Sequence, residues 1–183
     1  MNNIRVIKSR RKTLALEIKN GEIIARIPLG CSAAELQRFI DSHASWIEKH
    51  MEKARKQEAA AEQEGHLTQE EIRSLAREAC RVIPERVRHY APLVGVTYGR
   101  ITIRNQKSRW GSCSSKANLN FNCLLMLAPG EVLDSVVVHE LCHCKYMNHS
   151  KQFYAEVLRV FPDYHKWHKW LKDNGGRLLA RML

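Results

Sequence analysis

The sequence has no long uninterrupted apolar stretch, and its first residues do not follow the basic, apolar, small-residue order of a secretory signal. A membrane-spanning helix needs about 20 predominantly apolar residues, and export through a signal peptide needs that order. We therefore expect neither a membrane span nor secretion. The chain also has no internal repeat.

Paired cysteine motifs are missing too, although the chain has six cysteines. None of them forms a C-x-x-C pair, which is typical of many zinc and thiol redox sites. Without a secretory signal, the six thiols are expected to stay reduced instead of forming a disulfide framework. We therefore expect a cytoplasmic protein.

Acidic residues are scarce relative to basic ones, with 19 Asp and Glu against 30 Lys and Arg and a net charge of +11. Such an excess favours anionic partners, namely nucleic acid, nucleotides or an acidic polypeptide. A solvated basic surface without a dedicated partner is an equally good interpretation, because charge alone identifies no site.

At 183 residues with 44% hydrophobic content, the chain has the size and composition of one globular domain with a small appendage. We divide it into an N-terminal β-hairpin and long helix (1–66) and a core (67–183), packed together as one structural unit. The Ala-, Glu-, Lys- and Gln-rich stretch 53–65 is the best candidate boundary.

Periodicity places the elements. Alternating apolar residues on both sides of Asn20-Gly21 predict a hairpin that pairs Ile18 with Ile23 and Leu16 with Ala25. Capping-box patterns predict helices after Ser32 and Thr68, and strands are expected over 96–104 and 118–127. Three further helices are expected to begin at Pro129-Gly130, after Ser150 and at Pro162, the last ending at Asn174-Gly175.

The strongest chemical signal is His139-Glu-Leu-Cys-His143, an HExxH motif within an apolar run. On a helix, residues four apart share a face, so the two imidazoles can bind one zinc ion. Glu140 can then act as the general base for a water molecule at that site. Two His and one Glu at this spacing would occur by chance only about 0.04 times in such a chain.

A catalytic zinc ion takes three protein ligands and keeps a fourth position open. His149 is the preferred third ligand, because Asn148 tolerates a left-handed conformation that would end the helix and Ser150 can cap the next one. Glu156, His165 and His168 are alternatives. Cys142 and Cys144 flank His143, and burial of these thiols is favoured over ligation.

Two segments of the sequence, Ser108-Arg-Trp-Gly-Ser-Cys113 and His139 to Ser150, resemble the YgjP-like metal-dependent hydrolases, which are related to the SprT-like zincin metallopeptidases. The resemblance implies an α+β fold with a zincin-like core, made of a small antiparallel sheet and the HExxH helix. It also implies zinc, or another divalent transition metal, bound by His139, His143 and His149, with Glu140 as general base.

The segment from Arg109 to Cys113 is a second candidate site. Arg109 could bind an anionic group and Trp110 could stack on a base or side chain. In the structural alternative, Trp110 fills the core and Gly111 makes a turn. By resemblance, an edge strand at 100–104 or 118–122 would line the cleft and pair with a peptide substrate.

Three functions are compatible with these features. The first is a zinc metallopeptidase acting on a peptide or protein, free or near nucleic acid. The second is a metal-dependent hydrolase of nucleotides or other phosphoanhydrides, suggested by the net charge and Arg109. The third is a non-catalytic, zinc-stabilised module that binds nucleic acid, which would need a fourth protein ligand such as Cys144.

Overall fold

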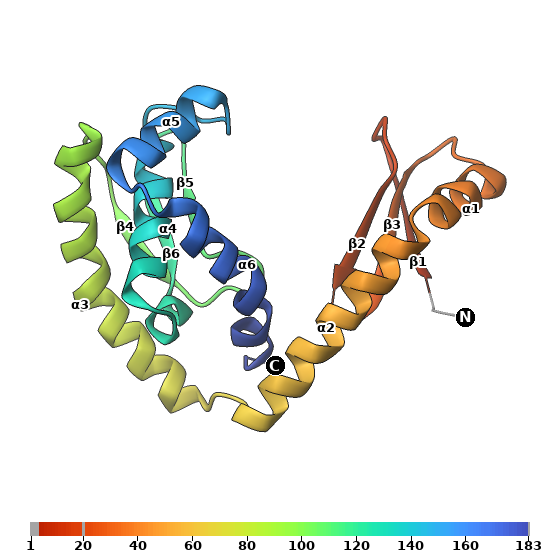
Figure 1. The fold of residues 1–183 in the computed structure, drawn as a ribbon, viewed down its shortest axis with the longest axis horizontal. Coiled ribbons are helices and arrows are strands. Elements are labelled where there is room, and N and C mark those ends of the chain that lie inside the picture. The colour runs from red at the N-terminus through yellow and green to blue at the C-terminus, as the bar shows by residue number, and fades with distance from the viewer. Residues whose placement is uncertain (1–3, 20, 183) are drawn as a thin grey trace. The chain divides into compact units, whose positions relative to one another are not determined.

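The computed structural model describes residues 4–19 and 21–182. Its contacts divide the chain into two compact units, Met1–Gln63 and Glu64–Leu183, close to the division at 66/67 expected from composition. Helices and two small sheets make up the chain, so the α+β class is confirmed (Figure 1). That the two units pack as one stays a prediction.

The N-terminal unit begins with a three-stranded sheet of order β1-β3-β2, formed by β1 (Ile4–Ser9), β2 (Ala15–Lys19) and β3 (Glu22–Pro28). The hairpin register is confirmed, since Ile18 pairs with Ile23 and Leu16 with Ala25. Asn20 of the expected turn lies outside the described residues, and Gly21 has a φ of +71°. Strand β1 adds to β3 in parallel.

Two helices follow in place of the single long helix expected. Helix α1 (Ala33–Ser42) begins with the predicted Ser32 capping box, and α2 (Ala44–Glu64) starts after a break at His43. The ring Nδ1 of His43 lies 2.8 Å from the carbonyl oxygen of Phe39, which ties the ring to the helix end that precedes it. Ile47 and Met51 of α2 bury their side chains with Ile23 in a small core.

In the C-terminal unit, α3 (Gln69–Val94) begins with the Thr68 capping box and ends at Gly95, which adopts a left-handed conformation. The second sheet contains β4 (Ile101–Arg104), β5 (Gly111–Cys113) and β6 (Leu119–Asn122) in the order β4-β6-β5. Because β4 pairs with β6 in parallel and β5 pairs with it antiparallel, this sheet is mixed and not purely antiparallel as expected.

Both strands expected in this unit are shorter than their apolar patterns suggested. The pattern over 118–127 ends as a strand at Asn122, whose side-chain oxygen accepts a hydrogen bond from the Leu124 N–H and opens a 3₁₀ helix, η1 (Cys123–Leu127). The pattern over 96–104 forms a strand only from Ile101. A buried apolar run therefore did not distinguish strand from helix.

Helix α4 (Gly130–Cys142) carries the HExxH motif through the centre of the unit. It contacts α3, β5, α5 (Lys151–Val160) and α6 (Tyr164–Ala180) (Figure 1). The expected end of the last helix at Asn174-Gly175 is wrong, because α6 continues to Ala180 and uses Gly175 for a close contact described below. No helix among the described residues is long and apolar enough to cross a membrane.

Candidate active site

Three histidines meet at the end of α4. His139 lies in the last turn of that helix, His143 is its C-cap, and His149 lies in the loop before α5. One ring nitrogen from each lies within 4.8 Å of the others. Nε2 of His139 is 3.2 Å from Nε2 of His143 and 3.1 Å from Nε2 of His149. The structure thus brings together the three residues preferred from sequence.

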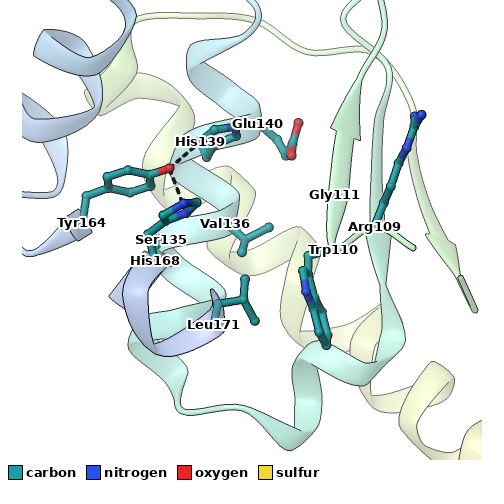
Figure 2. Close-up of a pocket in the computed structure, with 10 residues that line it drawn as sticks. All are labelled: Arg109, Trp110, Gly111, Ser135, Val136, His139, Glu140, Tyr164, His168 and Leu171. Atoms are coloured by element: carbon teal, nitrogen blue, oxygen red, sulfur yellow. Dashed lines mark hydrogen bonds between the residues drawn. The ribbon is translucent and has the colours of Figure 1, made fainter. Parts of the chain in front are cut away.

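The far nitrogens of two of these rings have partners that fix their orientation. Nδ1 of His143 donates to the carbonyl oxygen of Tyr146 at 2.9 Å, which leaves Nε2 of the neutral ring with only a lone pair. Nδ1 of His139 lies 2.9 Å from the hydroxyl of Tyr164, which also contacts Nδ1 of His168 at 3.2 Å (Figure 2). Such partners are typical of metal-binding imidazoles.

This nitrogen cluster suits a divalent metal ion. A proton on Nε2 of His139 could be donated to only one of the two neighbouring nitrogens, so the other close contact would lack a well-directed hydrogen bond. A cation between the rings removes that conflict. Two nitrogens that bind one tetrahedral zinc ion at about 2.0–2.1 Å lie about 3.3–3.4 Å apart, close to the separations found here.

Burial also keeps the cluster ready to bind a cation. It lowers the pKa of His139 to about 3, with a smaller contribution from His143, so the ring is neutral at physiological pH. Phe153, which is fully buried, packs against all three rings, with centroid distances of 4.5–5.0 Å. These contacts with Phe153 hold the three rings in place, so the rings need little rearrangement to bind a metal.

Glu140 lies beside the cluster as a buried carboxylate. No cation or hydrogen-bond donor among residues 4–19 and 21–182 pairs with it, so it is not one half of a structural ion pair. Burial raises its pKa to about 8. An unpaired carboxylate in a cavity, with a proton affinity near neutral pH, has the properties of a general base.

Gly111 of β5 gives the Glu140 side chain its space. A Cβ atom at residue 111 would lie 2.7 Å from both Cγ and Oε1 of Glu140. Gly111 therefore does not serve a turn, as the structural alternative supposed, but lies in a strand where a side chain would displace the carboxylate. Figure 2 shows the two residues facing each other.

Of the three alternative metal ligands, Glu156 and His168 are engaged elsewhere, and His165 lies exposed on α6 outside the group of three histidines. Glu156 accepts hydrogen bonds from Lys145 and Arg159, and His168 contacts the hydroxyl of Tyr164. Sγ of Cys144 lies 3.7 Å from Sγ of Cys113. In the described part of the chain, the group that could hold a metal contains no fourth His, Cys, Asp or Glu, which leaves a position for water or substrate.

The turn that brings in His149 differs from the one expected. Helix α4 ends at Cys142 with His143 still in a right-handed conformation, and the chain then reverses through hydrogen bonds to Leu141 and Cys142. Asn148 does not have a positive φ, so the expectation that it ends the helix is wrong. Ser150 caps α5 as expected, its hydroxyl accepting from the Phe153 N–H.

The cysteines near the site are buried or half-buried thiols. Cys142 is fully buried, and burial raises its pKa to about 12. The pKa of Cys113 is also raised to about 12, first by burial and then by Cys144. A nucleophilic role for Cys113 is therefore not supported, because the reactive species is the thiolate.

Arg109 and Trp110 both lie at the site, in different roles. Trp110 is half-buried and lines a cavity of about 250 Å³ with His139, Glu140 and Leu171. Arg109 is exposed at the rim of this cavity, and also lines a second one, of about 290 Å³, on the side of His143 and His149. Within the described residues, no acidic group pairs with the Arg109 guanidinium.

Sequence analysis missed two residues that hold the site. The buried side chain of Asn122 donates to the carbonyl oxygens of Gln106 and Arg109 and thereby fixes the loop before β5. Its signal was the alternation of asparagines in 118–122, which the sequence showed without revealing the partners. Tyr164 orients His139 from 25 residues away, a distance over which local sequence carries no signal.

Comparison of the chain with known proteins identifies a matching family. The YgjP-like family model, described as a metallopeptidase domain, matches residues 12–75 and 62–174. No curated protein matches the chain.

Two solved structures are similar to part of the chain. The metallopeptidase zymogen abylysin of Pyrococcus abyssi has 22% identity and a TM-score of 0.45, covering 50% of this chain and 93% of that one. The metallopeptidase zymogen jannalysin of Methanocaldococcus jannaschii has 22% identity and a TM-score of 0.44, covering 49% of this chain and 93% of that one.

The family match extends over most of the chain, and it contains the three histidines, Glu140 and the loop that supports β5. The chain therefore belongs to the YgjP-like family and is a metal-dependent hydrolase with that family's metallopeptidase domain.

Proposed function

We propose that the chain is a zinc-dependent metallopeptidase in which His139, His143 and His149 hold the metal and Glu140 carries the proton. The observation that supports this most directly is the convergence of three imidazole nitrogens beside the unpaired, buried carboxylate of Glu140 on α4. Other divalent transition metals could bind the same nitrogens, with affinities that depend on the metal.

When bound, zinc would lower the pKa of a water molecule and polarise the substrate carbonyl. Glu140 would accept the proton of that water and deliver it to the amine that leaves. Its confinement against Gly111 limits the positions that the carboxylate can take. Tyr164 and Tyr146 would keep the imidazoles of His139 and His143 oriented toward the metal.

Strand β5 offers an edge to a peptide beside these residues, whereas β4, the edge expected at 100–104, lies on the other side of β6. Strand β6, which includes most of the expected segment 118–122, lies inside the sheet and cannot do so. Trp110 and Ser114 bond to β6 through their backbones, so the alternate residues Gly111 and Cys113 turn their N–H and C=O groups outward. An extended peptide could pair with these groups next to Glu140.

The proposal is tested with Glu140→Gln in the zinc-loaded full chain. We expect loss of peptide cleavage with unchanged zinc content, because the amide keeps the shape but cannot accept the proton. Asp134→Asn is the matched control: it is a buried carboxylate on the same helix, paired with Arg86. Asp134→Asn should lower stability and retain cleavage. Activity that persists in Glu140→Gln would contradict the assigned role.

Hydrolysis of a phosphoanhydride is a second candidate, favoured by the unpaired Arg109 at the rim of both cavities. A guanidinium binds phosphate oxygens in a bidentate manner. A panel of nucleoside triphosphates and unstructured peptides, each with and without chelator, separates the two. Chelator-sensitive release of phosphate with no peptide cleavage would favour this candidate.

Nucleic acid stays a possible neighbour of the substrate, because the chain has a net charge of +11. A purely structural zinc site would be closed by four protein ligands. Cys144, the expected fourth ligand of a non-catalytic module, contacts Cys113 instead. Affinity for single-stranded DNA that falls steeply with salt would show that the basic surface is used.

A further inference from the structure

We infer that the cavity between β5 and α6 binds the side chain of the substrate residue that follows the scissile bond, and that it selects a large apolar side chain such as phenylalanine. This inference rests on the proposed peptidase function and adds the substrate class. The cavity opens directly beside Glu140 and His139, so its occupant would lie next to the reacting bond (Figure 2).

The volume of the cavity suits one large side chain. At about 250 Å³ it exceeds the roughly 150 Å³ of an apolar cavity that binds benzene. It is also smaller than the pockets of about 300–1,000 Å³ that hold whole drug-sized ligands. A phenyl ring fits this space, whereas a methyl group would leave most of it unfilled.

The walls of the cavity are apolar. The side chains of Trp110, Val136 and Leu171 face one another across it (Figure 2). Among the described residues that line it, the two polar side chains without a partner, Glu140 and Arg109, lie at the mouth and the rim of the cavity. The polar groups between the apolar walls already have partners: the hydroxyl of Ser135 donates to the carbonyl oxygen of Val132 at 2.7 Å, and the hydroxyl of Tyr164 contacts two histidines. A polar side chain between these walls would therefore lose water without gaining a hydrogen bond.

Two contacts fix Trp110 as a wall. A Cβ atom at Gly175 of α6 would already lie 3.0–3.2 Å from the indole, so the ring packs directly on the α6 backbone. The carbonyl oxygen of Trp110 accepts from the N–H of Asn122, which holds the main chain. The cavity is preformed, and binding of an apolar side chain needs no ordering of its largest wall.

The orientation of the substrate follows from β5. Antiparallel pairing is slightly more stable than parallel pairing, so a peptide on this edge should run from Cys113 toward Gly111. Residues after the scissile bond then lie on the Trp110 side, in the apolar cavity. Residues before it lie in the second cavity, which His143, His149 and Met147 line.

The first test maps cleavage sites by mass spectrometry. The zinc-loaded full chain is incubated with peptides that differ at one position, which carries Ala, Ser, Leu, Phe or Trp. We expect cleavage on the N-terminal side of Phe or Leu, with kcat/KM for Phe at least about tenfold above that for Ala. Cleavage without preference, or cleavage after the apolar residue, would overturn the inference and leave the peptidase function intact.

Binding of the same peptides to Glu140→Gln protein separates the assignment of the cavity from the proposed peptidase function. Tighter binding of the Phe peptide than the Ala peptide, by at least about tenfold, supports the cavity even if wild-type protein cleaves nothing, in which case only the peptidase function fails. Equal binding of the two peptides counts against the cavity.

Variants of the walls test which residues set the preference. Val136→Phe should fill the cavity and lower the ratio of kcat/KM for the Phe peptide to that for the Ala peptide about tenfold or more. Leu171→Ala, the milder change, should shift the preference from Phe toward Trp. Leu158→Ala, a partly buried leucine of α5 outside the cavity, is the control and should change neither. A preference that Leu171→Ala leaves unaltered would contradict the assignment.

Discussion

Replacement of Gly111 by alanine should disable the enzyme without removing its metal. The added Cβ would lie 2.7 Å from Cγ and Oε1 of Glu140 and 2.9 Å from Cδ, closer than real Cβ contacts. The atoms that it meets include the carboxylate assigned to proton transfer. Either the carboxylate moves away or β5 withdraws from α4, and both change the geometry of the site.

The size of the effect can be worked out from these distances. Relief of the overlap needs a shift of up to about 1 Å, and a misplacement of that size costs about 10²-fold in rate. General base catalysis contributes about 10²–10⁴-fold, so the shift need not remove all of it. We therefore expect kcat to fall about 10²-fold, together with a loss of about 1–3 kcal/mol in the free energy of unfolding from overpacking.

The assay compares kcat, zinc content and thermal stability of Gly111→Ala with those of Gly99→Ala. A Cβ at Gly99 would be crowded to a similar degree, lying 2.5 Å from Oδ1 of Asn118, but far along the chain from Glu140. Gly99→Ala should lose stability and keep kcat. Wild-type kcat in folded Gly111→Ala protein would refute the view that this glycine positions the base.

Three further outcomes are expected. Tyr164→Phe removes the hydroxyl that contacts His139, so zinc affinity in a competition with a chelator should fall about tenfold, whereas Tyr90→Phe should leave it unchanged. Hydrogen bonds from Arg159, and to a smaller extent from Lys145, lower the pKa of Glu156 from its ordinary value of 4.5 to about 2. This interaction stabilises the fold above about pH 4.5 and is lost as the pH falls toward 2. In urea titrations, Glu156→Gln should therefore be less stable by about 1–2 kcal/mol at pH 7, after allowance for solvent screening, and equal to wild type near pH 2. The raised pKa of Cys113 predicts that iodoacetamide at pH 8 modifies this half-buried thiol more slowly in the folded protein than after unfolding, and equally rapid modification of the folded protein would contradict the raised pKa.

The features that sequence predicted well depend on neighbours in the chain. The capping boxes at Ser32 and Thr68 formed as expected, because their donors and acceptors lie three residues apart. The HExxH spacing placed His139 and His143 on one face of a helix for the same reason. The hairpin register followed from a two-residue connection and alternating burial.

The features that sequence missed depend on contacts between distant segments. In the structural alternative for 109–113 the glycine at position 111 makes a turn, and the sequence predicts a helix end at 175, because glycine usually serves those purposes. Each instead gives space to a side chain from another element, Glu140 in one case and Trp110 in the other. Tyr164 falls within the helix expected to begin at Pro162, but its contact with His139 exists only in the folded chain.

The central claim is that three histidines hold a catalytic metal with one position open. X-ray absorption spectroscopy of the zinc-loaded full chain tests it directly. We predict about three imidazole nitrogens and one further oxygen at about 2.0–2.1 Å, with no sulfur, and loss of one imidazole in His149→Ala. A zinc–sulfur distance near 2.3 Å, or an unchanged spectrum in His149→Ala, would contradict the assignment.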